Sequence, residues 1–574
     1  MSKLLEMPST KAQKKKYGHD LSQLLKFTSS CGHLLPVFYD FALPGDKYKM
    51  NTQMFTQLTD IVSPAMMKIT EHVEWFFIPL KQISQVAGDA LYGISDLKTS
   101  LLPSNISVKN IIPLGDLHKV SANVFGSGEW ASVTYSQLEP EELDEYGVFK
   151  RYNAIRLMEL LGFPPQIATE DFISQTQHIY FNPMLLCCYQ KIFFDNYRLT
   201  DRTPNDATFY NLDLYARTGY LSDATDYIYE QLFTMHYRSF ARDFFQITFP
   251  APLIDIGDIG MLDKVDSNDS LVQYNKWLGI GMVVNNDGRG SSAGDDALDK
   301  SVSAAGANYP LNTSILRGMF AVEKLMEITR RAAKRYEAQT LAHFGVKVPE
   351  GISDKVYKIG EESSIIQINE VISQSVGSAT VDGEQITSTL GERGGKGASY
   401  SPAGRNIRFT APCHGIIMAV YSAIPEADYE QEGIDRLNTY ARREDYPIPS
   451  LDNMGMQPLF NYQVVFSSNP SANAGIIGWQ YRWQELKLKY NRCCGAFNST
   501  YDNWTVKRHN AFSLWQDFYV NPQFMDNILL LTFQNGEGDI MSYENCFARD
   551  PMLHWFKFNV FKSSFLSTYS LPKL

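Results

Sequence analysis

The amino-acid sequence predicts a mainly β fold with long helical and loop insertions. Tyr and Phe are abundant, with 32 and 34 copies in 574 residues, and aromatic residues favour strands and subunit contacts. Turn-forming pairs such as Pro44-Gly45 and Ser63-Pro64 repeatedly break the apolar stretches. The charged fraction of 20% is ordinary, so the body of the chain is expected to fold. Length alone suggests two to four domains, although a large β fold with long insertions can reach this size as one domain.

The first third of this domain alternates between strand and helix patterns. In the stretch 66–78, apolar residues such as Met67, Ile69 and Val73 partly alternate with polar ones, as in a half-buried strand. By the same criteria, strands are predicted over residues 34–41, 48–58, 66–78 and 242–250. Residues 80–240 are predicted to be a mixed insertion, with helical apolar spacing over 152–161 and 184–197.

Residues 253–312 differ in composition from the rest of the chain. Gly, Ser, Asp, Asn and Ala dominate, and such residues tolerate the backbone angles of turns and loops. A long irregular stretch in a compact domain is usually functional or disordered. We therefore treat 253–312 as a surface insertion. Its candidate exposed residues are Asn285, Asn286, Asp287, Gly288, Arg289 and Gly290.

The clearest predicted helix follows, over residues 312–344. Asn312, Thr313 or Ser314 can cap its start, and Gly345 can end it. Apolar residues from Ile315 to Phe344 recur on one stripe, and basic residues from Arg317 to Arg335 recur on another. Glutamates such as Glu327 lie close enough for pairs at i,i+4. A salt-bridged face is therefore favoured over a phosphate-binding one.

The C-terminal part of the chain again shows mainly strand patterns. Residues 376–403 are Gly-rich and are predicted to be a loop. Strands are predicted over 364–374, 406–409, 415–424 and 462–466.

Residues 1–30 are predicted to be a basic N-terminal arm, separate from a single domain at 31–574. The arm offers little apolar area to offset the entropy of ordering. Its lysines could contact the phosphates of a nucleic acid without reading sequence, or the arm could be a solvated tail. The candidate DNA-contacting residues are Lys3, Lys11, Lys14, Lys15 and Lys16.

Composition and motifs argue against several other classes of protein. A net charge of −11 disfavours a protein that coats nucleic acid with its whole surface, although an inner face could still bind it. No apolar run is long enough for a membrane span, and the N-terminus lacks a signal-peptide core. The seven cysteines are expected to be reduced thiols.

No catalytic, cofactor or metal motif was found. The segment Gly394–Gly397 lacks the Ser or Thr of a phosphate loop, and Gly288–Gly294 has the wrong spacing for a dinucleotide fingerprint. Acidic residues near Asp287 lack the ligand spacing of an EF-hand. We therefore expect a protein that is not an enzyme and holds no cofactor or metal.

Several motifs, met in order along the chain, resemble one family. Two lie near the ends: Leu34–Asp46, which leads to Trp-Phe-Phe-Ile-Pro at Trp75–Pro79, and Tyr-Ser-Leu-Pro at Tyr569–Pro572. Three more lie between them: the helix with its turn after Phe344, the blocks 428–433 and 442–447, and the stretch 478–495. Together they resemble the major capsid proteins of the Microviridae, small single-stranded DNA phages, in particular the gokushovirus-type branch. Cys413-His-Gly departs from the family's acidic-His-Gly form.

The resemblance implies a fold and a function. The fold would be an eight-stranded antiparallel jelly roll with long insertions, of which 253–312 would rise outward near the threefold axes. The protein would assemble through five-, three- and twofold contacts into a T=1 icosahedral shell around circular single-stranded DNA. Implied partners are a small basic DNA-binding virion protein, a pilot protein and a host surface receptor. The protein would be made in the bacterial cytoplasm and work in the virion.

The alternative is a bacterial β-sandwich that binds carbohydrate, such as a lectin. It would need a groove of aromatic and carboxylate side chains on one sheet, and it would remain a monomer or a small oligomer. An enzyme, the third possibility, would need a cluster of titratable residues in a closed cleft.

Overall fold

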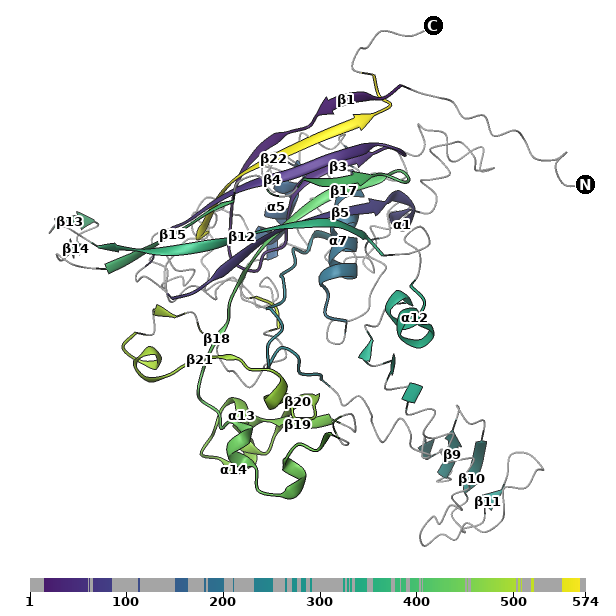
Figure 1. The fold of residues 1–574 in the computed structure, drawn as a ribbon, viewed down its shortest axis with the longest axis vertical. Coiled ribbons are helices and arrows are strands. Elements are labelled where there is room, and N and C mark those ends of the chain that lie inside the picture. The colour runs from purple at the N-terminus through teal and green to yellow at the C-terminus, as the bar shows by residue number, and fades with distance from the viewer. Residues whose placement is uncertain are drawn as a thin grey trace, which may run out of the picture.

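Eight strands in two four-stranded antiparallel layers form the body of the protein (Figure 1). The computed structural model describes residues 15–59, 66–84, 150–163, 184–200, 232–250, 336–347, 355–372, 393–401, 406–449, 456–501 and 550–567, with short pieces between them. The first layer consists, in spatial order, of β2 (Gln23–Ser29), β22 (Met552–Ser564), β4 (Lys47–Leu58) and β15 (Arg393–Ser401). The second consists of β3 (Leu35–Ala42), β17 (Gly415–Pro425), β5 (Ile69–Pro79) and β12 (Tyr357–Ile372).

The order of these strands is that of a jelly roll. Counted along the chain, the first, eighth, third and sixth strands are neighbours in one layer. The second, seventh, fourth and fifth are neighbours in the other. The layers join where Gln367–Ile372 of β12 pairs with Arg393–Ala398 of β15. The predicted eight-stranded antiparallel jelly roll is therefore confirmed.

The edge of the first layer is formed by residues that the sequence placed in the arm. In β2, Gln23–Ser29 pairs with Met552–Phe558 of β22. Strand β1 (Tyr17–Asp20) continues this edge and pairs with Phe561–Ser564. Figure 1 shows β22 lying between these N-terminal strands and β4. The described part of the predicted arm thus belongs to the sheet, because its backbone groups bond to a strand remote in sequence.

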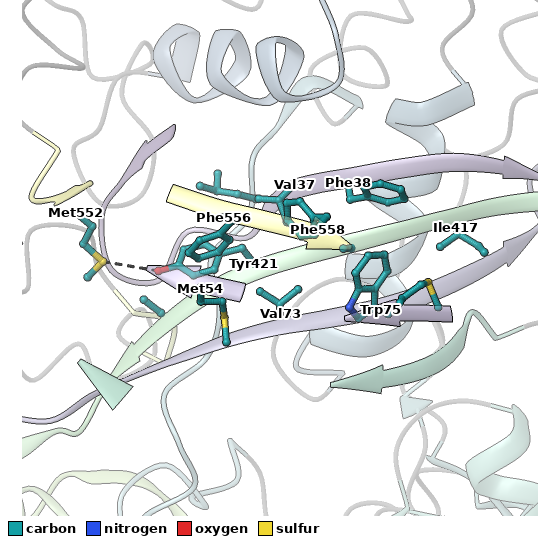
Figure 2. Packing of buried hydrophobic residues seen from close by; sticks show 14 of the residues in the cluster. Val37, Phe38, Met54, Val73, Trp75, Ile417, Tyr421, Met552, Phe556 and Phe558 are labelled. Atoms are coloured by element: carbon teal, nitrogen blue, oxygen red, sulfur yellow. Dashed lines mark hydrogen bonds between the residues drawn. The ribbon is translucent and has the colours of Figure 1, made fainter. Parts of the chain in front are cut away.

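Large apolar side chains fill the space between the layers (Figure 2). Buried and exposed positions alternate along β22, as expected when only one face of a strand meets the core. The ring of Phe558 on β22 meets that of Trp75 on β5 edge to face, with centroids 6.0 Å apart. Phe38 on β3 packs against both rings. Burial of such rings is the main stabilising contribution to this core.

A chain of polar side chains crosses the same core. The carboxylate of Glu71, fully buried on β5, accepts hydrogen bonds from Thr56 (2.5 Å), Ser399 (2.5 Å) and Tyr421 (2.9 Å). Burial raises the pKa of Glu71, although these three hydroxyl donors act in the opposite direction. The chain continues through His554, whose Nδ1 lies 2.9 Å from the Thr56 hydroxyl. It therefore connects side chains from both layers.

The protonation of His554 follows from this chain. The Thr56 hydroxyl has one proton and gives it to Glu71, so Nδ1 of His554 donates to Thr56. Nε2 then accepts from the Ser29 hydroxyl, 2.7 Å away. Burial and the nearby charge of Arg156 lower the pKa of His554 to about 3. The imidazole is therefore neutral in the folded protein.

Acidification from pH 6.5 to 5.5 should lower the free energy of unfolding by about 1 kcal/mol through His554 alone. The unfolded chain takes up a proton near pH 6.5, whereas folded His554 does so only near pH 3. Stability that is present above pH 6.5 is therefore lost as the pH falls toward 3. Urea unfolding of the wild-type and His554→Gln chains at both pH values measures this difference. His236, with its pKa also lowered to about 3 by burial, remains in both chains. Equal losses in the two chains would contradict the expectation.

Helices cover the outer face of the second layer. Helix α5 (Lys150–Leu160) and helix α7 (Met184–Ile192), continued by a π-helical turn at Phe193–Tyr197, confirm two helices predicted within the 80–240 insertion. Leu157 of α5 and Leu186 of α7 are buried in one cluster with Phe76, Ile78 and Met418 of the sheet. The two helices thus shield the apolar outer face of the second layer from water.

A second, smaller core lies between segments remote in sequence. Its buried side chains are Phe244, Phe245, Tyr429, Leu459, Val464 and Ile477. The elements around it are β18 (Asp428–Glu430), β19 (Met456–Phe460), α13 (Asn461–Val464), α14 (Pro470–Asn473), β20 (Ile476–Tyr481), α15 (Gln484–Lys487) and β21 (Asn491–Cys493).

Two predicted strands are wrong in this region. Residues 462–466 were expected to be a strand, but Asn461–Val464 is a helical turn. The Gln463 side chain accepts from the Phe460 backbone N–H and bends the chain there. Residues 242–250 were also expected to be a strand. There the Asp243 carboxylate accepts from the N–H groups of Phe245 and Gln246 and forms a turn instead.

The other predicted elements have mixed outcomes. The strands near 406 and 415 are confirmed by β16 (Ile407–Thr410) and β17. Helix α12 (Tyr336–Phe344) confirms the C-terminal end of the long helix, and Gly345 follows it with a φ of +67°. The Gly-rich stretch predicted as a loop contains the hairpin β13 (Gly377–Val381) and β14 (Glu384–Ser388), followed by β15.

Short elements complete the described chain. Within the predicted surface insertion, β8 to β11 form a small antiparallel sheet rather than continuous loop. The short elements are α1 (Leu80–Ile83), β6 (Ile112–Pro113), β7 (Tyr180–Phe181), β8 (Lys264–Val265), β9 (Leu271–Asn275), β10 (Ile280–Val284), β11 (Gly290–Ser291), and 3-10 turns at Arg436–Thr439, Arg443–Asp445 and Gly495–Asn498.

Candidate nucleic-acid interface

The outer side of the first layer is a sheet face that stays exposed. We call it the open face. It is formed by alternate residues from Lys47 to Gln57 on β4 and from Leu553 to Phe561 on β22, with their register partners. The intervening residues of both strands point into the core and are buried. The two layers therefore differ: helices cover the outside of one, whereas the outside of the other meets solvent.

One row of the open face carries three aromatic rings on adjacent strands. Trp555 on β22 is the register partner of Phe55 on β4, and Phe55 is the partner of Tyr400 on β15. Lys26 on β2 lies beside Trp555 at the other end of the row. Tyr400 is 68% exposed and Phe55 36%, which is unusual for large rings in a sheet. The three rings thus form a platform in which Tyr400 and Phe55 are exposed and Trp555 is half-buried.

A second row of the open face is made of amides. Asn559 on β22 donates to the side-chain oxygen of Asn51 on β4 at 2.8 Å. Asn51 in turn donates to that of Asn406 at 3.0 Å. These bonds hold three polar side chains in line across the sheet, between the aromatic row and the rows nearer Lys49. The row orders the face without adding charge.

The open face is strongly basic, although the whole chain has a net charge of −11. Among its described outward positions, the one acidic residue is Asp20, near Lys557. Lys49 and Arg408 are direct register partners, an arrangement in which like charges repel. The basic residues of the face are Lys26, Lys47, Lys49, Lys396, Arg408 and Lys557. Such a surface favours a polyanionic ligand.

The arm residues predicted to contact DNA are only partly within the described chain. Lys15 and Lys16 precede β1. The Lys16 ammonium donates to the Gly45 carbonyl and lies 4.7 Å from the centre of the Phe565 ring, so it is tied to the protein. The Lys15 ammonium lies 5.8 Å from the ring of Tyr17. Lys3, Lys11 and Lys14 lie outside the described residues.

The predicted outer-surface residues lie almost entirely outside the described chain. Of residues 285–290, only Gly290 is described, where it begins β11. Their role therefore stays a prediction.

No local sequence pattern predicted that the open face would be a site. Lys47 and Lys49 alternate with buried residues within β4, but their basic and aromatic neighbours come from four other strands, β2, β15, β16 and β22. The strand pairing alone brings these residues together.

Acidic and basic side chains elsewhere serve structural roles. Glu74 on β5 accepts from Arg238 at 2.5 Å and also from Lys358 and Tyr197. These charges, with burial acting against them, lower the pKa of Glu74.

Within the described residues, no group of three His, Cys, Asp or Glu side chains is placed to hold a metal ion. The described helices include none that is long and apolar enough to cross a bilayer.

The jelly roll, with one helix-covered face and one open basic face, has an architecture shared by viral capsid and lectin domains. Residues 6–86 and 154–574 match the model of the family described as "Capsid protein (F protein)". The chain belongs to this family. This confirms the resemblance to the major capsid proteins of Microviridae of the gokushovirus type, and with it a structural role in a capsid.

Curated relatives agree with this membership. The capsid protein VP1 of Bdellovibrio phage phiMH2K is 21% identical over 90% of this chain and 88% of that protein. The VP1 proteins of Chlamydia phage 1 and Spiroplasma virus 4 are 25% and 26% identical over 36% and 35% of this chain. These two alignments span about a third of each relative's length, 35% and 36%.

Proposed function

We propose that this capsid protein assembles into a T=1 icosahedral shell that encloses circular single-stranded DNA. The observation that carries the proposal is the open face, which concentrates basic residues on one side of an acidic chain. An inner surface of a nucleic-acid container needs this charge, whereas the outer surface benefits from net negative charge for solubility. The open face is accordingly the inner side of the shell.

Contacts between identical subunits complete the proposal. Around α12, large apolar side chains are exposed, including Tyr336 and Phe344, each 78% exposed. Exposed apolar groups of this size suit subunit interfaces. Repeated contacts about five-, three- and twofold axes make closure of the shell cooperative. Further proposed partners are a small basic DNA-binding protein, a pilot protein and a host receptor bound through the 253–312 insertion.

Assembly is tested by expressing the full chain and examining it by size-exclusion chromatography and negative-stain microscopy. We expect closed particles of uniform diameter, with nuclease-protected single-stranded DNA inside when they are made during phage infection. A chain that stays monomeric at high concentration would contradict the proposal and favour a carbohydrate-binding β sandwich. Particles trimmed at residues 285–300 can then be compared with intact ones for attachment to host cells.

Deleting residues 1–14 should leave folding and assembly intact but reduce the DNA protected in particles. The deletion removes lysines that can neutralise phosphates, while Lys16 and the first described strand remain in place. The DNA content per particle, measured from absorbance and nuclease protection, gives the result. A full-length chain with Lys3, Lys11 and Lys14 changed to Gln is the matched control, because it keeps the length of the arm and removes only these charges. Unchanged DNA content in both would end the assignment of DNA contacts to the arm.

A further inference from the structure

We propose that the aromatic row Trp555–Phe55–Tyr400 is a stacking platform for unpaired nucleic-acid bases, with the neighbouring basic residues holding the phosphates. The inference rests on the proposed enclosure of single-stranded DNA and assigns it a binding site on this chain. In this proposal the open face recognises the flat surfaces of the bases, which are accessible in a single strand and stacked out of reach in a duplex.

The geometry of the row suits successive bases. Its three rings occupy matching register positions on β22, β4 and β15. Adjacent strands lie about 4.8 Å apart, so the rings extend roughly 10 Å across the sheet. Each ring projects from an outward position, and none of the three belongs to a buried core cluster. Rings at this spacing offer several π faces to one strand of nucleic acid.

Cations lie on the sides of the row where a backbone would pass. Lys26 ends the row beside Trp555, and Lys557 occupies the next outward position along β22. Lys49 and Arg408 lie beyond the amide row, at roughly 20 Å from Phe55 by strand rise. Base stacking in the middle with phosphate contacts at the edges is the arrangement used by proteins that bind single strands without sequence preference.

Two features favour nucleic acid over a protein partner. The Lys49–Arg408 register pair and the excess of basic residues oppose a basic peptide. Among the described residues, no acidic side chain lies within ion-pair distance of Lys26, Lys49 or Arg408, so their charge is available to a ligand. An acidic peptide would satisfy the charges but would not need three rings in line. A polyanion with flat apolar faces satisfies both.

The platform is tested with the full-length subunit and a fluorescent oligothymidylate of about twenty nucleotides. Binding is followed by anisotropy at several salt concentrations, with a duplex of equal length for comparison. Removing one ring, as in Tyr400→Ala or Phe55→Ala, should weaken oligothymidylate binding roughly tenfold. Duplex binding should change little. Lys49→Gln should instead reduce the salt dependence for both ligands.

Matched variants separate stacking from general damage. Tyr446→Ala and Phe466→Ala remove aromatic rings that are each 55% exposed but lie outside the open face. Both should bind oligothymidylate like the wild type. Tyr400→Phe keeps the ring and should also bind normally. Circular dichroism and thermal melting of each variant show whether the fold is retained.

Several outcomes would overturn the platform. It fails if the ring variants bind like the wild type, if the two control variants lose as much affinity, or if duplex and single strand bind equally well. Displacement of the oligonucleotide by a polyglutamate peptide at equal charge would make the face a docking site for acidic protein. If the subunit binds no oligonucleotide but particles contain protected DNA, the platform is wrong and the enclosing function stands. Particles without DNA would instead refute the enclosing function.

Discussion

Phe558→Ala should lower the free energy of unfolding by about 3–5 kcal/mol. Phe558 is fully buried at the centre of the jelly roll, where its ring meets those of Trp75, Phe38 and Phe556. Removing it leaves a cavity between two sheets that are joined along one edge and cannot collapse freely. Urea unfolding followed by circular dichroism measures the loss.

The control for this substitution lies on the same strand. Phe561, three residues away, points to the open face and is 54% exposed. Phe561→Ala should cost less than about 1 kcal/mol, since little buried area is lost. Similar losses for the two variants would show that β22 is not paired in the register described.

Arg156→Met should cost about 3–5 kcal/mol, because it leaves a buried carboxylate without its cation. The Arg156 guanidinium on α5 donates to both oxygens of Asp550 at 2.8 Å, and both side chains are almost fully buried. It also bonds to Nδ1 of His33 at 2.8 Å. Arg156 thus links helix α5 to His33, before the N-terminal strand β3, and to Asp550, before the C-terminal strand β22.

Restoring neutrality should recover much of this loss. The double variant Arg156→Met with Asp550→Leu removes both charges, so the destabilisation should be smaller than in the single variant. An exposed pair provides the comparison: Lys487 bonds to Asp452 at 2.5 Å, and Lys487→Met should change stability by less than about 1 kcal/mol. A double variant as unstable as Arg156→Met alone would show that the charge of Asp550 is not the cause.

Local patterns in the sequence were enough to predict many elements. Alternation of apolar and polar residues predicted the strands near residues 34, 48, 66 and 415. Apolar spacing predicted the helices near 152 and 184, and a terminator residue, Gly345, predicted the end of α12. The two false strands have apolar and β-branched residues, but Gln463 and Asp243 form side-chain bonds to the backbone that turn the chain. Such bonds depend on geometry that composition does not show.

The candidate site could not be predicted in the same way. Each residue of the aromatic row looks ordinary within its own strand, and Phe55, Tyr400 and Trp555 are far apart in sequence. Their meeting depends on pairings of β4 with both β15 and β22. Lysine content and the family resemblance together predicted DNA contacts for the basic arm, yet the Lys16 ammonium is bound to the protein itself. Clustering in space was the missing information.

The position of β22 also affects how the subunit is made. This strand lies in the middle of the first layer, between β2 and β4, but it is translated after nearly all the rest of the described chain. The strands of the second layer and the helices that cover it are translated earlier. They can therefore begin to pack while the chain is still on the ribosome. The first layer can close only once β22 has emerged, so a nascent chain has no complete basic face. The face proposed to bind nucleic acid is thereby completed only when synthesis of the subunit is nearly finished.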